Sequence, residues 1–122
     1  MSLSVLVVDD SPIARKMLIR SLPANWDIEI TQAGGGAEAL AAYRSGKVDV
    51  MFLDLTMPEI DGYQVLETLQ HEDMNCLVIV VSADIQPEAV ERVKGMGAIA
   101  FIKKPVDAVR VEAVLREYGV IV

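Results

Sequence analysis

Side chains able to carry out phosphoryl transfer stand at the ends of several apolar segments of this chain. Asp9 and Asp10 end one such segment, Asp54 ends another and Ser82 a third, while Lys104 follows a fourth in IKKP. A carboxylate can act as a nucleophile, further carboxylates can bind a cation, and a lysine and a hydroxyl can bind phosphate oxygens. If the fold gathers these residues, phosphoryl transfer is the chemistry that they predict.

Three carboxylates at one place need a compensating positive charge. Two unit charges 4 Å apart repel by about 4 kcal/mol at an effective dielectric constant near 20, so Asp9, Asp10 and Asp54 would otherwise acquire raised pKa values or destabilise the fold. Mg²⁺ relieves this repulsion, since it commonly takes one or two carboxylates together with waters and a phosphate. We predict a Mg²⁺ site, with Mn²⁺ as the alternative ion. Taken singly, Asp9 and Asp10 fit helix caps and Lys104 fits a surface lysine, but the combination favours a site.

Two kinds of periodicity predict the elements that hold these residues. Apolar segments typical of strands cover Leu3–Val8, Trp26–Thr31, Val50–Leu53, Leu77–Val81 and Ala98–Ile102. Helical patterns lie near 11–22, 36–45, 61–70, 86–95 and 106–118. Five strands alternating with five helices predict an α/β domain with a parallel sheet. Such sheets bind ligands outside the carboxyl ends of their strands, where the polar residues stand.

The strand segments differ in polarity. Leu3–Val8, Val50–Leu53 and Leu77–Val81 are apolar on both faces, as expected for central strands covered by helices on both sides. Trp26–Thr31 alternates between apolar and polar residues, which predicts an edge strand. The basic residues of ARKMLIR (14–20) are assigned to the solvent-exposed side of the first helix.

Length and composition limit the classes of protein to which this chain can belong. The 122 residues predict one domain, 1–122. A net charge of −7 disfavours nucleic acid and anionic membranes as partners, and no apolar run is long enough to span a bilayer. The single cysteine, Cys76, excludes an internal disulfide and fits a cytoplasmic location.

Four motifs carry a resemblance to a known family: VVDDS (7–11), DLTMPEIDG (54–62), VSA (81–83) and GAIAFIKKP (97–105). In order and spacing they resemble the receiver domain of two-component response regulators, over essentially the whole chain. The resemblance implies a flavodoxin-like, three-layer α/β/α sandwich with five helices and sheet order 2-1-3-4-5. That strand order is an implication of the family and does not follow from the periodicity.

The resemblance also implies roles at the metal site. Asp54 would accept a phosphoryl group from a phosphohistidine of a sensor histidine kinase or a histidine phosphotransfer protein. Asp10 and Asp54 would bind Mg²⁺ together with the backbone carbonyl of Thr56, and Asp9 would act through a water molecule.

A second set of implied roles concerns the switch. Lys104 would pair with a phosphate oxygen, after a Lys104–Pro105 peptide bond that is usually cis in the family. Ser82 would bind another phosphate oxygen, and Phe101 would turn from an outward to an inward position. This sequence has Ser82 and Phe101 where many relatives have Thr and Tyr, respectively.

The resulting hypothesis is a stand-alone signalling switch rather than an enzyme, with self-catalysed phosphoryl transfer and slow autodephosphorylation only. Output would be contact with a downstream protein effector through the face formed by 86–95, 98–102 and 106–117. The chain would be a monomer or a weak phosphorylation-dependent dimer. A chemotaxis-type output and a phosphorelay intermediate both stay open.

Three alternatives remain. A metal-dependent phosphatase with an aspartate nucleophile would need a second aspartate two residues after Asp54, where Thr56 stands. A dinucleotide site would use Gly34, Gly36 and Ala39, which satisfy G-x-G-x-x-A, but this pattern alone is weak. A flavin domain would place its phosphate loop after the first strand, where two aspartates would repel a phosphate.

Overall fold

Strands and helices alternate along the chain in the computed structural model, which describes residues 2–83 and 86–121. The five strands are β1 (Leu3–Val8), β2 (Ile28–Ala33), β3 (Val50–Asp54), β4 (Leu77–Ser82) and β5 (Ala100–Lys103). The five helices are α1 (Pro12–Ser21), α2 (Gly36–Ser45), α3 (Gly62–His71), α4 (Pro87–Gly95) and α5 (Ala108–Glu117). All ten predicted elements are therefore present.

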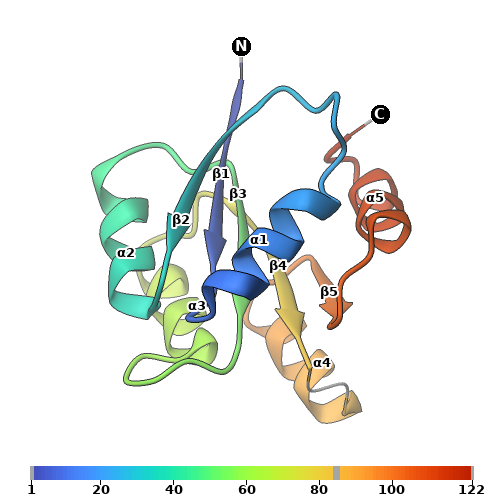
Figure 1. Cartoon of the computed structure of the whole chain (residues 1–122). Coiled ribbons are helices and arrows are strands. Elements are labelled where there is room, and N and C mark those ends of the chain that lie inside the picture. The colour runs from blue at the N-terminus through green and yellow to red at the C-terminus, as the bar shows by residue number, and fades with distance from the viewer. Residues whose placement is uncertain (1, 84–85, 122) are drawn as a thin grey trace.

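The strands form one parallel sheet in the order β2-β1-β3-β4-β5. Helices α1 and α5 cover one face, and α2, α3 and α4 cover the other (Figure 1). The predicted three-layer fold and strand order are confirmed. Among the helices of the described residues, none is both long enough and apolar enough to cross a membrane.

Successive side chains of the central strands point to opposite faces of the sheet and so form two separate hydrophobic cores. Leu6, Met51 and Val80 face α2, α3 and α4, while Val7 and Phe52 face α1 and α5. All five side chains are almost completely buried. The three apolar segments are thus the central strands, as predicted, because each must pack against helices on both of its faces.

Strand boundaries differ from the predictions at the polar ends. Asp54 and Ser82 are the last residues of β3 and β4 rather than the first residues after them. β2 begins two residues later than predicted, because Trp26 still belongs to a turn in which its N–H donates to the carbonyl of Pro23 at 3.2 Å. Its position at the edge of the sheet is confirmed.

The loop from β3 to α3 passes very close to the end of β3 at Gly62. The Gly62 N–H donates to the Leu55 carbonyl at 3.0 Å, and a Cβ atom on Gly62 would lie 2.4 Å from the Asp54 carbonyl oxygen. Asp61 then starts α3 as its N-cap, in a capping box with Gln64. The Asp-Gly pair therefore brings the start of α3 against the residue that ends β3.

Gly62→Ala should destabilise the protein by about 3 kcal/mol, since the added methyl meets backbone atoms of Asp54 and Leu55 that cannot rotate away. Gly95→Ala is the matched control, because Gly95 is also in a helix and a Cβ there meets nothing within 4 Å. We expect the control to change stability by less than about 1 kcal/mol. Urea unfolding of both variants measures the difference, and equal stabilities would contradict the close approach.

Candidate functional site

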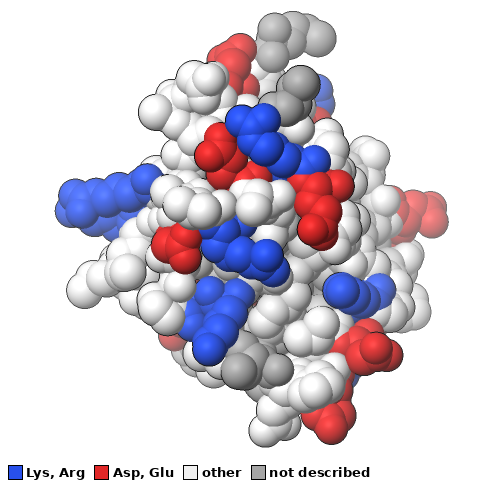
Figure 2. All heavy atoms as spheres, turned by 90° about the vertical axis from the view of Figure 1, so that its right-hand side faces the viewer, with Lys and Arg blue, Asp and Glu red and all other residues white. Residues whose placement is uncertain are grey.

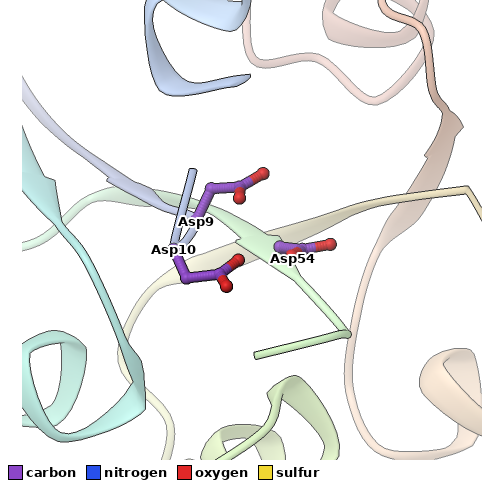
Figure 3. A group of neighbouring side chains, drawn as sticks. All are labelled: Asp9, Asp10 and Asp54. Atoms are coloured by element: carbon purple, nitrogen blue, oxygen red, sulfur yellow. The ribbon is translucent and has the colours of Figure 1, made fainter. Parts of the chain in front are cut away.

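Three carboxylates meet at the carboxyl ends of β1 and β3. Asp9, Asp10 and Asp54 each offer an oxygen, and these atoms all lie within 4.8 Å of one another. Their side chains point into the same space from the two neighbouring strands (Figure 3). Asp9 and Asp54 are buried, with 6% and 5% of their surface exposed, whereas Asp10 is exposed. The cluster therefore has a buried floor and an open side.

Lys104 enters this cluster from the end of β5. Its Nζ lies 2.6 Å from Asp9 Oδ2 and 3.3 Å from Asp54 Oδ1. The backbone fixes its position, because the Lys104 N–H donates to the Ser82 carbonyl at 2.9 Å. The Lys104–Pro105 peptide bond is cis, as the resemblance implied. Lys104 is thus shared by two carboxylates from different strands.

Burial and charge act in opposite directions on Asp54. Burial, followed by the negative charge of Asp9, raises the pKa of the Asp54 carboxyl above its ordinary value, although Lys104 and a backbone hydrogen bond from Thr56 oppose the increase. Burial acts to lower the pKa of Lys104, but the hydrogen bond to Asp9 and the charges of Asp54 and Asp9 raise it overall. Lys104 therefore holds its proton more tightly than a free lysine, and ionisation of Asp54 costs more than ionisation of a free aspartate.

This balance predicts a pH dependence of metal-free stability. Because the folded pKa of Asp54 is raised, the folded chain binds this proton more tightly than the unfolded chain. The contribution of Asp54 to the free energy of unfolding should therefore increase as the pH falls through the folded pKa towards the ordinary aspartate value. Urea unfolding in chelator, for wild type and Asp54→Asn at neutral and mildly acidic pH, isolates this contribution. We expect the stability advantage of the variant to shrink on acidification; a constant or growing advantage would contradict the raised pKa.

Helix capping does not account for the first two aspartates. The N-cap of α1 is Ser11, whose Oγ accepts from the Ala14 N–H at 3.2 Å. Asp9 Oδ1 instead accepts from the Ser11 N–H at 2.9 Å, which holds the carboxylate at the end of β1. The simpler interpretation of Asp9 and Asp10 as helix caps is therefore wrong.

The other predicted site residues, Ser82, Thr56 and Phe101, differ in solvent exposure and in distance from the cluster. Ser82 is buried at the end of β4, beside Lys103 in the strand register. Thr56 is exposed in the loop after β3. Phe101 lies outside the carboxylate cluster, half-buried in β5. It packs against the core beneath α2, α3 and α4 and lines a surface hollow on its other side.

Arg15 is a residue near the cluster that the sequence analysis missed. Its Nη1 donates to the backbone carbonyl of Asp9 at 2.6 Å, and its Nε donates to Gln32 Oε1 at 2.9 Å. Arg15 is intermediate in exposure and its hydrogen bond to Gln32 is exposed, so it lies at the border of the solvent-exposed side of the first helix and also contacts the ends of β1 and β2. The helical period places Arg15 on α1, but the period carries no information about a contact with β2.

The glycine pattern of the dinucleotide alternative has a structural explanation. Gly36 is buried at the start of α2, where a Cβ would lie 2.5 Å from the side chain of Ile60. This glycine therefore allows α2 to pack closely against the loop before α3, and its surface is not open to a phosphate.

The residues present suit a magnesium ion. The group consists of carboxylate oxygens, which are hard ligands, and one side of it is open. Zinc and copper sites typically use histidine or cysteine, and neither residue type occurs in this group.

Comparison with known proteins identifies the family. The sequence model of the response regulator receiver domain matches residues 5–116. The chain belongs to this family. Receiver domains are phosphorylation-activated signalling switches that bind Mg²⁺ at an acidic pocket and act with histidine kinases and downstream effectors. Functionally they are phosphoacceptors and, broadly, not enzymes.

Relatives of this receiver domain include whole proteins and parts of larger ones. Chemotaxis protein CheY of Listeria monocytogenes is 38% identical, over 89% of this chain and 92% of that protein. A protein-glutamate methylesterase/protein-glutamine glutaminase of Anaeromyxobacter dehalogenans is 37% identical, but the chain spans only 30% of its length.

The solved structures show the same fold. CheY of Borrelia burgdorferi, in a complex described as CheX-CheY-BeF3-Mg, is 32% identical with a TM-score of 0.86, over 95% of this chain and 89% of that one. The receiver domain of a LuxO repressor protein from Vibrio parahaemolyticus has a TM-score of 0.89 at 23% identity, over 97% and 90% of the two chains. The latter likeness concerns the fold alone.

Proposed function

We propose that Asp54 of this receiver domain accepts a phosphoryl group from a phosphohistidine on a sensor histidine kinase or histidine phosphotransfer protein. The observation that supports this role is the position of Asp54 in the carboxylate cluster, with Oδ1 3.3 Å from Lys104 Nζ. Its carboxylate oxygen attacks phosphorus, the phosphorus–nitrogen bond breaks, and an acyl phosphate forms. The histidine nitrogen leaves with the bonding electron pair.

Asp10, Asp54 and the backbone carbonyl of Thr56 are the proposed ligands of Mg²⁺, with Mn²⁺ as the alternative. When bound, the ion supplies positive charge that offsets the carboxylates and the phosphoryl oxygens. Asp10 suits a direct ligand because its side chain is exposed at the open side. Asp9 suits an indirect role through water, since Ser11 and Lys104 already occupy its two oxygens.

The proposed switch couples the phosphate to the far end of the sheet. Lys104 pairs with one phosphate oxygen and thereby leaves Asp9, while Ser82 binds another. Because Ser82 and Lys103 are register partners on β4 and β5, movement at Ser82 is transmitted towards Phe101 on the same strand pair. Phe101 is half-buried, and the proposed response is an inward movement of its ring.

The proposed output surface is the α4–β5–α5 face, seen in Figure 2, where Lys and Arg side chains gather across the centre beside Asp and Glu. The lining of a hollow there includes Phe101, Tyr118, Lys94, Lys103, Arg110 and Glu117. Three cations against one acidic side chain around this hollow, in a chain that is acidic as a whole, suit an effector segment that carries acidic residues. Effector capture with and without beryllofluoride would distinguish a chemotaxis-type target from a phosphorelay histidine protein.

We further propose that residues 1–122 act as one receiver domain, either monomeric or in a weak phosphorylation-dependent dimer. The family match over 5–116 supports one domain, and gel filtration with and without beryllofluoride tests the oligomeric state. A shift to a dimer only with beryllofluoride supports the second form.

Labelling with acetyl phosphate tests the phosphoacceptor function directly. A receiver domain should gain one acid-labile phosphoryl group in Mg²⁺, retain it after removal of the donor, and gain none in excess chelator. The phosphatase alternative predicts continuous phosphate release without retained label. Labelling that persists in chelator would contradict the proposed metal site.

A further inference from the structure

The Arg15 guanidinium joins three elements beside the carboxylate cluster. From α1, it donates to the Asp9 carbonyl at the end of β1 and to the Gln32 side chain on β2, at 2.6 and 2.9 Å. No acidic side chain of the described residues forms an ion pair with it within 4.0 Å. Its hydrogen bonds are therefore directed at a backbone carbonyl and an amide, which suits a residue that fixes geometry.

The first glycine of the AGGGAEA segment lies next to this contact, and a Cβ there would only touch it at ordinary van der Waals distance. A Cβ on Gly34 would lie 3.6 Å from Arg15 Nη1 and 3.5 Å from Glu38 Oε1. The Gly34 N–H donates to Glu38 Oε2 at 3.2 Å, which holds the turn after β2 against the start of α2. Gly34 thus lies beside the guanidinium without crowding it.

With the contact to Arg15, every polar group of Asp9 has a hydrogen-bond partner. The Asp9 N–H donates to the Ala33 carbonyl at 3.1 Å, Oδ1 accepts from Ser11, Oδ2 accepts from Lys104, and the carbonyl accepts from Arg15. That carbonyl belongs to the peptide group between Asp9 and Asp10. Its orientation determines the direction in which the exposed Asp10 side chain leaves the backbone.

We propose that Arg15 is a positioning residue for the metal site: it holds the Asp9–Asp10 peptide so that the Asp10 carboxylate faces Asp54. Arg15 does not touch the ion in this role. The inference rests on the proposed Mg²⁺ site and adds a residue that the family motifs quoted above do not include. Loss of groups that orient metal ligands typically weakens metal binding by about 10- to 100-fold.

The direction of the change in Mg²⁺ affinity distinguishes a positioning role of Arg15 from a purely electrostatic one. Removal of a nearby positive charge strengthens binding of a cation, because the repulsion between them disappears. Loss of a positioning contact weakens binding, because Asp10 is then free to turn away. Arg15→Gln should therefore weaken Mg²⁺ binding by about tenfold. Lys16→Gln removes the same charge from the next position of α1, which is exposed, and should leave the affinity unchanged or slightly tighter.

The experiment is a Mg²⁺ titration of the whole chain without a phosphodonor, followed through amide chemical shifts, at a temperature where each variant is folded. Arg15→Lys, which can reach the Asp9 carbonyl but cannot span both acceptors, should restore part of the affinity. Gln32→Ala removes one acceptor at an exposed position of the edge strand, so it tests the same network without threatening the core. It should weaken binding by about threefold, less than loss of the whole contact.

Unchanged or tighter binding in Arg15→Gln, or equal losses in Arg15→Gln and Lys16→Gln, would overturn the proposal. If Arg15→Gln does not fold, unchanged affinity in Gln32→Ala overturns it. Failure of the underlying function has a different signature: wild type would then show no saturable Mg²⁺ shifts at Asp9, Asp10 and Asp54.

Discussion

Asp54→Asn is expected to reduce phosphoryl labelling by at least about 100-fold, because an amide oxygen is not an effective nucleophile at neutral pH. The same substitution should stabilise the metal-free chain by about 1 kcal/mol, since a buried charge facing Asp9 is removed. In a domain of this size that corresponds to about 4 °C in Tm. Radiolabel incorporation from acetyl phosphate and thermal unfolding in chelator measure the two effects.

These two results together distinguish chemistry from misfolding. A variant that is more stable than wild type but takes no label has lost the acceptor and not the fold. Asp73→Asn is the control, since it removes one carboxylate from an exposed position far along the chain and should label normally. If Asp54→Asn still takes up label, another residue is the phosphoacceptor and the proposed function of Asp54 is wrong.

Lys104→Met should lower metal-free stability by about 2 kcal/mol. It leaves the buried Asp9 and Asp54 carboxylates facing each other without a cation, and loss of one partner of a buried ion pair costs about 3–5 kcal/mol. The 27% exposure of the Lys104 side chain reduces this cost. The variant should bind Mg²⁺ more tightly than wild type, because the ion no longer competes with the ammonium group.

Phosphoryl transfer should nevertheless decrease by about 100-fold in Lys104→Met, because a charge aimed at the developing phosphate is absent. Lys103→Met is the matched control: the neighbouring side chain is exposed, and we expect wild-type stability and labelling. Urea unfolding, Mg²⁺ titration and labelling rates measure the three effects. Weaker Mg²⁺ binding in Lys104→Met would contradict a competition between the lysine and the ion.

Local patterns in the sequence were sufficient to predict the strands and helices of this fold. Apolar strands of period two and helices of period 3.6 are properties of neighbouring residues, so the ten elements could be predicted to within a few positions. The order of the strands could not be obtained in this way, because period and length do not say which strands pair. It came from the four motifs that resemble the receiver family.

The sequence by itself determined which chemistry was available: three aspartates and a lysine at strand ends, and a motif set specific enough to indicate the family. Only the tertiary structure showed which of these groups form ion pairs and hydrogen bonds with one another. Lys104 pairs with Asp54 and, across 95 positions of the chain, with Asp9. Arg15, from the border of the exposed side of α1, reaches the Asp9 carbonyl and Gln32 on β2. Such contacts depend on how distant segments pack, and a periodic pattern within one segment contains no information about its neighbours in space.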